Sequence, residues 1–286
     1  MSLPPGTTEL IERALDEDLG SGDVTAEATV PAGLQGQAHL IQKEPGVIFG
    51  LDIAAEVFRR VGATEFDRTV IEGHWHESVP RDMALIHGPA RAILAGERVA
   101  LNFVGHLSGI ATMTARFVDA VAGTGTKILD TRKTTPGMRW LEKAAVVAGG
   151  GRNHRMGLYD AFLIKENHVA VAGGIGEAVR RARASLPDHE VEIECRDAAE
   201  VQEALEAGAD RLLLDNMDSA ALTAAVDARD SAAARSSSRA LLEASGGVTV
   251  ENVAAIAETG VDYVSVGALT HSAPALDLSM LVDVQG

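Results

Sequence analysis

Positively charged side chains gather in one stretch of an otherwise acidic chain. The whole chain has a formal net charge of -16, whereas residues 127–168 contain eight Lys and Arg against four Asp and Glu. Arg132, Lys133, His154 and Arg155 lie beside short apolar runs or glycines, not on a solvated helical face. Arg can hold a carboxylate or a phosphate through two parallel hydrogen bonds, which Lys cannot. This pattern predicts a pocket for a ligand with more than one carboxylate.

Two acids and two glycine turns could supply a second half of such a site. Glu194 and Asp215 suit Mg²⁺, which takes one or two carboxylates together with substrate oxygens. The turns at 245–247 and 267–268 could hold a phosphate on backbone N–H groups. Lys165 could pair with a phosphate or with negative charge that develops during a reaction. The residue types therefore predict an enzyme that joins a polycarboxylate to a phosphorylated sugar.

The elements that would position these residues alternate regularly after Gly123. Six short apolar segments read as strands, at 127–131, 161–165, 191–195, 211–215, 240–244 and 262–267. Amphipathic helices are expected between them, at 138–149, 175–186, 198–208, 219–229 and 250–260. This alternation predicts parallel βαβ units. Because almost every strand ends on a charged residue or a glycine turn, and no glycine fingerprint follows the first strand, we expect an α/β barrel, incomplete with six strands.

The first third of the chain lacks this regular alternation of strands and helices. Thr7 or Thr8 can cap a helix that ends at Gly20, and residues 21–33 read as a loop. Short strand-like runs follow, at 37–42, 46–50, 69–75, 83–88 and 91–95, with one helix at 51–62. This predicts an α+β sandwich domain over residues 1–110, linked by an apolar helix over 97–121 to a barrel domain over 111–286. Gly105 and Gly109 would allow close packing of that helix, and residues 231–239 read as a flexible loop.

Composition excludes several classes of protein. A pI near 4.9 argues against a nucleic-acid binder, which needs a broad basic surface. The single cysteine, Cys195, excludes an intrachain disulfide framework and suits a reducing compartment. The N-terminus lacks the long apolar run of a signal peptide, and no stretch has the length of a bilayer span. We therefore expect a cytoplasmic enzyme with no nucleic-acid or membrane partner.

Several motifs resemble those of the quinolinate phosphoribosyltransferase family. They are DTRKTTPGMR, GGGRNHRMGLYDAFLIKENH, LLLDN, EASGG and VGALTHS, with EDLGSGDVT and ERVALNFVGHLSGIAT before them. The resemblance spans nearly the whole chain in family order. It implies an N-terminal α+β domain, an incomplete barrel, and a homodimer in which each N-terminal domain covers the partner's barrel. It also implies quinolinate and phosphoribosyl pyrophosphate as substrates, with Mg²⁺, and nicotinate mononucleotide, pyrophosphate and CO₂ as products of NAD biosynthesis.

The resemblance also assigns roles to single residues. It implies that Arg132, Lys133, His154 and Arg155 hold the two carboxylates of quinolinate, and that Arg98 enters this site from the partner subunit. Lys165, Glu194 and Asp215 match residues that face phosphoribosyl pyrophosphate and its metal; with Lys133 they are the candidate catalytic residues, and Glu194 and Asp215 the candidate metal ligands. The other candidate substrate contacts are Thr131, Ser245, Gly246, Gly247, Val266, Gly267 and Ala268.

Other interpretations of the same residues remain open. Lys165 could form a Schiff base in a sugar-phosphate aldolase, which borohydride trapping would reveal. The chain could also be a catalytically altered paralogue, such as the related proteins associated with molybdenum transport. His154 could contact the ligand or could orient Arg155. On its mostly apolar helix, Arg98 would be costly to bury without an anion, although an acid of its own chain could pair with it.

Overall fold

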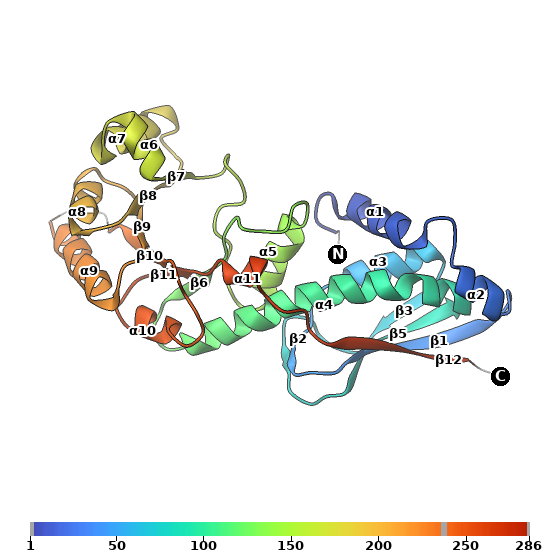
Figure 1. Ribbon diagram of the computed structural model, residues 1–286. Helices are drawn as coiled ribbons and strands as arrows, with labels where there is room; N and C mark the ends of the chain where they lie inside the picture. Colours follow the sequence, from blue (N-terminus) through green and yellow to red (C-terminus); the bar gives the residue numbers. More distant parts are fainter. Residues whose placement is uncertain (1–2, 236–238, 285–286) are drawn as a thin grey trace. The chain divides into compact units, whose positions relative to one another are not determined.

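The computed structural model describes residues 3–235 and 239–284, and the chain forms two units (Figure 1). Unit 1 comprises the chain up to residue 115, residues 134–150 and the chain from residue 269, and unit 2 comprises residues 116–133 and 151–268. The expected division at residue 110 follows chain order, whereas each unit combines separated segments. The last segment joins unit 1 because its strand pairs with the first strand of the chain.

Unit 1 is built on a four-stranded antiparallel sheet with the order β12-β1-β5-β3. Its strands are β1 (Gln35–Gln42), β3 (Glu65–Arg68), β5 (Arg81–Pro89) and β12 (Leu278–Val284), and β2 (Gly46–Val47) pairs with β4 (Trp75–His76). Helices α1 (Thr7–Leu19), α3 (Leu51–Val61) and most of α4 (Ala90–Ala120) lie over one face of the sheet (Figure 1). Fully buried side chains from both layers, including Ile11, Phe58 and Ile86, form the core between them.

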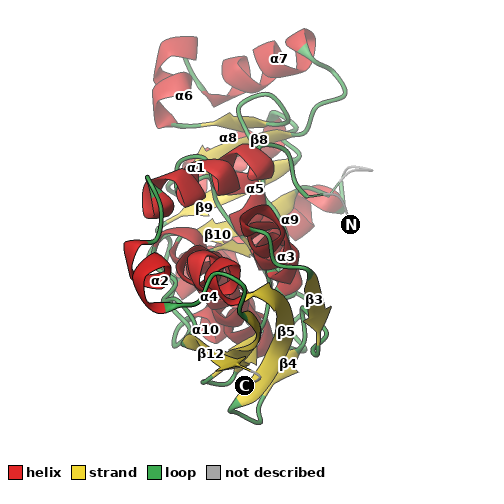
Figure 2. Ribbon diagram, turned by 90° about the vertical axis from the view of Figure 1, so that its right-hand side faces the viewer, coloured by secondary structure: helices red, strands yellow, loops and turns green. Residues whose placement is uncertain are grey.

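Unit 2 is a parallel sheet with the order β6-β11-β10-β9-β8-β7. The strands are β6 (Lys127–Leu129), β7 (Phe162–Ile164), β8 (Val191–Cys195), β9 (Arg211–Asp215), β10 (Leu241–Ser245) and β11 (Tyr263–Ser265). Helices α6 (Glu166–Ala172), α7 (Ile175–Ser185), α8 (Ala198–Glu206), α9 (Ser219–Ala233) and α10 (Val253–Ala257) connect them (Figure 2). No pairing joins β6 to β7 in the described chain, so the barrel is incomplete, as expected.

All six predicted strands of the barrel are present, but several predictions elsewhere were wrong. Residues 91–95 begin α4 instead of forming a strand, and the strand expected at 69–75 is replaced by β3 at 65–68. The expected loop at 21–33 contains α2 (Val24–Thr29), because the Asp23 carboxylate caps it by accepting the N–H groups of Thr25 and Ala26. Gly6, not a threonine, stands at the N-cap of α1.

Further differences concern the barrel connections and the C-terminus. The helices α6, α11 (Ala268–His271) and the strand β12 were not expected, and α5 (Arg139–Ala148), which was, belongs to unit 1. Residues 231–233, expected in a loop, extend α9, while residues 236–238 of that loop lie outside the described residues. Within the described chain, no helix combines the length and the apolar character needed to cross a bilayer.

Candidate active site

One cavity of unit 2 collects side chains from the carboxyl ends of the barrel strands. It has a volume of about 340 Å³. Eight of its lining residues were expected from the sequence: Thr131, Arg132, Lys133, His154, Arg155, Lys165, Asp215 and Ser245. Five were not: Asp130, Leu163, Leu213, Glu243 and Ser265. Strand ends that converge on one mouth are where an α/β barrel places its chemistry, so this cavity is the candidate active site.

The cationic wall of the cavity is partly withdrawn from water. Burial, and next the charge of Arg132, lower the pKa of the Arg155 guanidinium below its usual value. The Nη1 of Arg155 donates to the Ala161 carbonyl at 3.3 Å, but its buried Nε has no hydrogen-bond partner among the described residues. A desolvated guanidinium beside a second positive charge is costly unless an anion neutralises it. The wall is therefore built for a ligand with negative charge.

The turn that carries Arg155 is held by the end of β6. Arg152 forms a parallel bridge with Leu129, and its N–H donates to the Ile128 carbonyl at 2.8 Å. The fully buried carboxylate of Asp130 accepts the N–H of His154 at 2.9 Å. Asp130 was not a candidate from the sequence, although an acid directly after an apolar strand was available as a signal. These contacts place residues 152–155 along the gap between β6 and β7.

Both ring nitrogens of His154 are engaged inside unit 2. Nδ1 accepts the backbone N–H of Arg155 at 2.7 Å, and Nε2 lies 2.8 Å from Oε2 of Glu192. Oε2 of Glu243 lies 3.6 Å from the same Nε2. Of the two roles considered for His154, this geometry favours orienting Arg155 over hydrogen bonding to a ligand.

The two acids beside His154 are among the most buried charged groups of unit 2. The side chains of Glu192 and Glu243 are 3 % and 1 % exposed. Burial raises the pKa of both carboxyl groups to about 7, and for Glu243 the charge of Glu192 is the next cause. The Nη1 of Arg211 lies 3.2 Å from Oε2 of Glu243 and partly offsets the burial. The sequence analysis missed both acids, although an acid inside an apolar parallel strand is itself a signal.

Of the two acids expected at the strand ends, Asp215 of β9 lines the cavity and Glu194 of β8 does not, although Glu194 pairs with Lys165, which does. Glu194 Oε2 accepts from the Lys165 ammonium at 2.9 Å, and Asp215 Oδ2 accepts from the side-chain amide of Asn216 at 2.8 Å. Carboxylate oxygens are ligands that fit a hard cation such as Mg²⁺. The Lys165 side chain is half-exposed and paired with a carboxylate, so it lacks the apolar pocket or the cationic neighbour that activates the lysine of a Schiff-base aldolase.

The glycine turns are only partly in the cavity. Ser245 lines it, and Gly246 and Gly247 follow with φ of 99° and 59°. A Cβ on Gly246 would overlap the side chain of Asn216, so the turn after β9 and the turn after β10 pack tightly against each other. Asn216 is the one described non-glycine residue with positive φ. Gly267 and Ala268 do not line the cavity. Val266 is buried and its N–H donates to the Leu129 carbonyl at 2.9 Å, so this N–H supports the wall.

Arg98 lies in unit 1 and is exposed on α4, so the expectation of a costly buried arginine was wrong. It lines a hollow of unit 1 together with Glu17, Asp18, Asn102 and His106. None of the described acids forms an ion pair with it. A solvated guanidinium without a partner is available to a ligand or to another chain.

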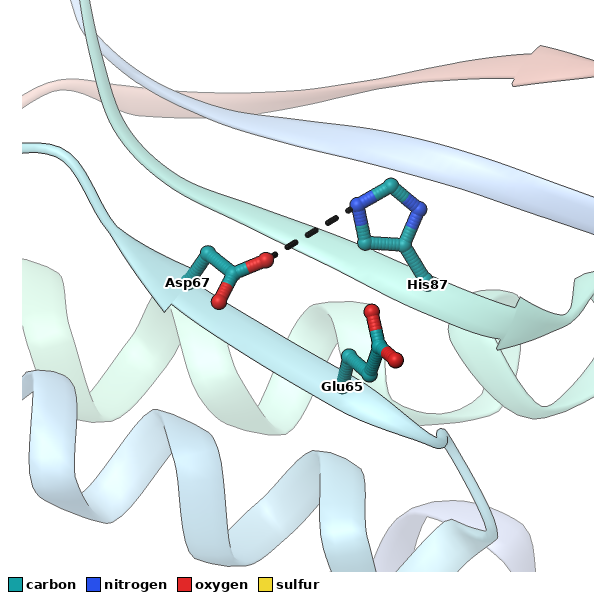
Figure 3. Close-up of side chains that lie close together, drawn as sticks. All are labelled: Glu65, Asp67 and His87. Atoms are coloured by element: carbon teal, nitrogen blue, oxygen red, sulfur yellow. Dashed lines mark ion pairs between the residues drawn. The ribbon is translucent and has the colours of Figure 1, made fainter.

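A second group of potential metal ligands lies away from the cavity, on the sheet of unit 1. Figure 3 shows Glu65 and Asp67 on β3 and His87 on β5, with His87 Nε2 4.0 Å from Asp67 Oδ2. Both carboxylates are exposed and stay hydrated. Because these carboxylates stay hydrated, they need no metal ion to offset a cost of burying their charges.

Comparisons with known proteins agree over both units. The family model of the quinolinate phosphoribosyl transferase N-terminal domain matches residues 23–108, and that of the C-terminal domain matches residues 110–281. The nicotinate-nucleotide pyrophosphorylase (carboxylating) of Mycobacterium leprae is 44 % identical over 275 residues, which cover 95 % of each chain. The quinolinate phosphoribosyltransferase (decarboxylating) 1b of Nicotiana tabacum is 40 % identical over 96 % of this chain and 82 % of its own.

A solved structure shows the same fold. The nicotinate-nucleotide pyrophosphorylase of Francisella tularensis superposes with a TM-score of 0.92 at 37 % identity, over 99 % of this chain and 98 % of that one. Three observations support one family assignment: the incomplete barrel, the cationic cavity and the matches to both domains of the family. The chain belongs to the quinolinate phosphoribosyltransferase family.

Proposed function

We propose that this chain transfers the phosphoribosyl group of phosphoribosyl pyrophosphate to quinolinate with loss of CO₂, which yields nicotinate mononucleotide and pyrophosphate for NAD biosynthesis. The observation that carries the proposal is the desolvated guanidinium of Arg155 beside Arg132, with a buried Arg155 Nε that lacks a partner among the described residues. A ligand with two carboxylates on adjacent ring carbons would supply an acceptor for that Nε and neutralise both guanidinium groups.

The two sides of the cavity would divide the substrates between them. Arg132, Lys133 and Arg155 would hold the pyridine dicarboxylate. Glu194 and Asp215, which end neighbouring strands, would hold Mg²⁺ together with the pyrophosphate, while Lys165 would donate to a phosphate oxygen. When bound, Mg²⁺ supplies positive charge to the departing pyrophosphate. The backbone at Ser245 would carry the 5′-phosphate end.

The reaction needs no nucleophilic side chain. The lone pair of the pyridine nitrogen forms a bond to C1′, and the C1′–oxygen bond to pyrophosphate breaks with its electrons on the leaving group. The ring then carries a positive charge. The bond from C2 to its carboxylate breaks, CO₂ leaves, and the electron pair left at C2 forms a C–H bond with a proton from solvent. The protein mainly positions the reactants and offsets charge, which fits a cavity without a Ser–His or Cys–His pair.

Release of pyrophosphate and CO₂ tests the proposal directly. The purified protein is incubated with quinolinate, phosphoribosyl pyrophosphate and Mg²⁺, and both products are followed with nicotinate mononucleotide. We expect equal amounts of the three products, and no turnover when nicotinate replaces quinolinate, because one carboxylate leaves one guanidinium unpaired. A folded protein that releases neither pyrophosphate nor CO₂ would overturn the proposal.

Two further features belong to the same proposal. A homodimer would let the exposed and unpaired Arg98 of one chain complete the dicarboxylate site of another. The acidic composition and the single buried Cys195 support a cytoplasmic location.

A further inference from the structure

We propose that Glu192 is a positioning residue for the dicarboxylate site, acting on Arg155 through the ring of His154. Glu192 has no part in the chemistry described above, and its side chain is 3 % exposed beneath the cavity. The binding role of Arg155 rests on the proposed function, whereas the orienting contacts rest on geometry alone.

The first step is the location of the proton on His154. Nδ1 accepts the backbone N–H of Arg155 at 2.7 Å, so its lone pair is used and it carries no proton. The ring proton must then be on Nε2, which donates to Oε2 of Glu192 at 2.8 Å. A carboxyl oxygen can accept this hydrogen bond whether or not the group is ionised. Glu192 therefore selects the one tautomer that can hold the N–H of Arg155.

The same side chains do not suit a metal ion, although ligand atoms of His154, Glu192 and Glu243 lie within 4.8 Å of one another. A protonated Nε2 has no lone pair to offer, and freeing it would break the contact of Nδ1 with the backbone. A cation is already present, because Nη1 of Arg211 lies 3.2 Å from Oε2 of Glu243. The group is a hydrogen-bond relay.

The second step carries the effect to the binding group. The chain at Arg155 is held on one side by Asp130, which accepts the N–H of His154 at 2.9 Å, and on the other by the ring of His154. Without an acceptor on Glu192, the nearest acceptor left to Nε2–H is Oε2 of Glu243 at 3.6 Å, which is too far for a good hydrogen bond, so the ring gains by turning. The backbone N–H of Arg155 then loses its partner, and the guanidinium is no longer fixed in the cavity wall.

Two substitutions of similar size separate this role from a general loss of stability. Glu192→Gln keeps an oxygen that can accept from Nε2, whereas Glu192→Leu removes every acceptor. We expect Glu192→Leu to raise the KM for quinolinate about tenfold, with the KM for phosphoribosyl pyrophosphate and kcat changed less than about threefold. Glu192→Gln should restore most of the quinolinate KM.

A matched control comes from the ion pair of Arg229 and Asp262 in unit 2. Asp262 Oδ2 accepts from the buried Arg229 at 2.7 Å, at the start of β11 and away from the strand ends that line the cavity. Asp262→Ala should lower the melting temperature but leave the quinolinate KM within about twofold of wild type, because it loses stability without touching His154. Equal KM changes in Glu192→Leu and Asp262→Ala would contradict the proposal.

NMR spectroscopy tests the tautomer of His154 independently of enzyme activity. Long-range ¹H–¹⁵N correlation spectra of ¹⁵N-histidine-labelled protein report the tautomer of each ring, and His154→Gln identifies the His154 signals. Wild type and Glu192→Gln should both show a proton on Nε2 and none on Nδ1, even if Glu192→Leu does not fold. A proton on Nδ1 in wild type would overturn the inference. Absence of turnover together with the Nε2–H tautomer would instead overturn the proposed function and leave the relay intact.

Discussion

The guanidinium of Arg155 combines burial, a neighbouring positive charge and a donor without a described partner. It is desolvated, adjoins Arg132 and has an Nε with no described partner, so an anion gains from both charge and hydrogen bonding there. Asp130 and His154 hold the backbone of its turn.

The planar fork of Arg155 should matter more than its charge. Arg155→Lys keeps the charge but removes the two parallel donors, so the KM for quinolinate should rise about tenfold or more in steady-state kinetics. Arg183→Lys is the control, because Arg183 pairs with Asp210 on the outside of unit 2. That variant should stay within about twofold of wild type, and a similar KM in both variants would argue against a bidentate contact.

The buried acids should make stability depend on pH. The pKa of Glu243 is about 7 in the folded protein and near 4.5 in the unfolded chain, so between these values the folded state holds a proton that the unfolded state has lost. The free energy of unfolding should therefore fall as pH rises through this window, by roughly 2 kcal/mol between pH 5.5 and 7 for one proton. Urea unfolding at pH 5.5, 7.0 and 8.5, without Mg²⁺, measures this.

Glu243→Gln provides the comparison for that pH dependence. A glutamine stays neutral at every pH, so the fall between pH 5.5 and 8.5 should be clearly smaller than in wild type. If both proteins lose the same stability over this range, Glu243 is not protonated in the folded state.

At the scale of elements, the long helix α4 depends on two glycines that admit the C-terminal segment. The N–H of Leu276 donates to the Gly105 carbonyl at 2.9 Å, and Gly109 lies against the backbone of Pro274. Both glycines have ordinary helical dihedrals, so close approach and not backbone conformation is the reason for them. This contact brings the chain to β12, which pairs with β1 in unit 1.

The two glycines should respond differently to the same substitution. A Cβ on Gly109 would overlap the Pro274 carbonyl, so Gly109→Ala should lose about 1–3 kcal/mol despite the better helix propensity of alanine. At Gly105 the nearest atom is the Leu276 carbonyl oxygen at 3.3 Å, and a small shift can relieve it. Thermal unfolding of both variants should show a clear drop only for Gly109→Ala. Equal melting temperatures would mean that the segment moves away at little cost.

At the scale of the whole molecule, the cationic stretch of residues 127–168 is divided between the two units. Residues 134–150, which include Arg139 and Lys143, belong to unit 1, and the cations of the cavity come from the flanking parts in unit 2. Arg98, also in unit 1, faces solvent without an acid partner among the described residues. A second copy of the chain is the partner that the proposed function gives to it.

Mixed dimers test that sharing of residues. Arg98→Ala and Arg132→Ala should each lose most activity alone. After unfolding and refolding together in equal amounts, some dimers would contain one site with both arginines intact, so up to about a quarter of wild-type activity per site should return. Size-exclusion chromatography with tagged chains confirms that exchange occurred. Exchanged dimers that remain inactive would show that Arg98 acts within its own chain or not at all.

The sequence by itself determined the barrel and most of its cavity. The alternation of apolar strands and amphipathic helices after Gly123 is a local pattern, and so is the cluster of cations in residues 127–168. Most of the lining residues could therefore be named before the fold was known, while Thr131 was named from the family resemblance. The family resemblance of the motifs rests on the same linear information. In the first domain the strand-like run at 91–95 misled, because packing on the sheet stabilises a helix there whatever the local β preference.

Tertiary structure alone decided which of these residues line the cavity and which of their hydrogen-bonding groups are already used. Both ring nitrogens of His154 are engaged, one by the backbone N–H of Arg155 and one by Glu192, and only the pairing of distant strands brings these residues together. The N–H of Val266 donates to the Leu129 carbonyl in β6. β12 joins β1 from the far end of the chain, which no local pattern specifies. Hydrogen-bond partners and burial depend on contacts between segments remote in sequence. The charge excess of residues 127–168 therefore predicted an anion site, while the fold decided which guanidinium groups of that stretch line the cavity.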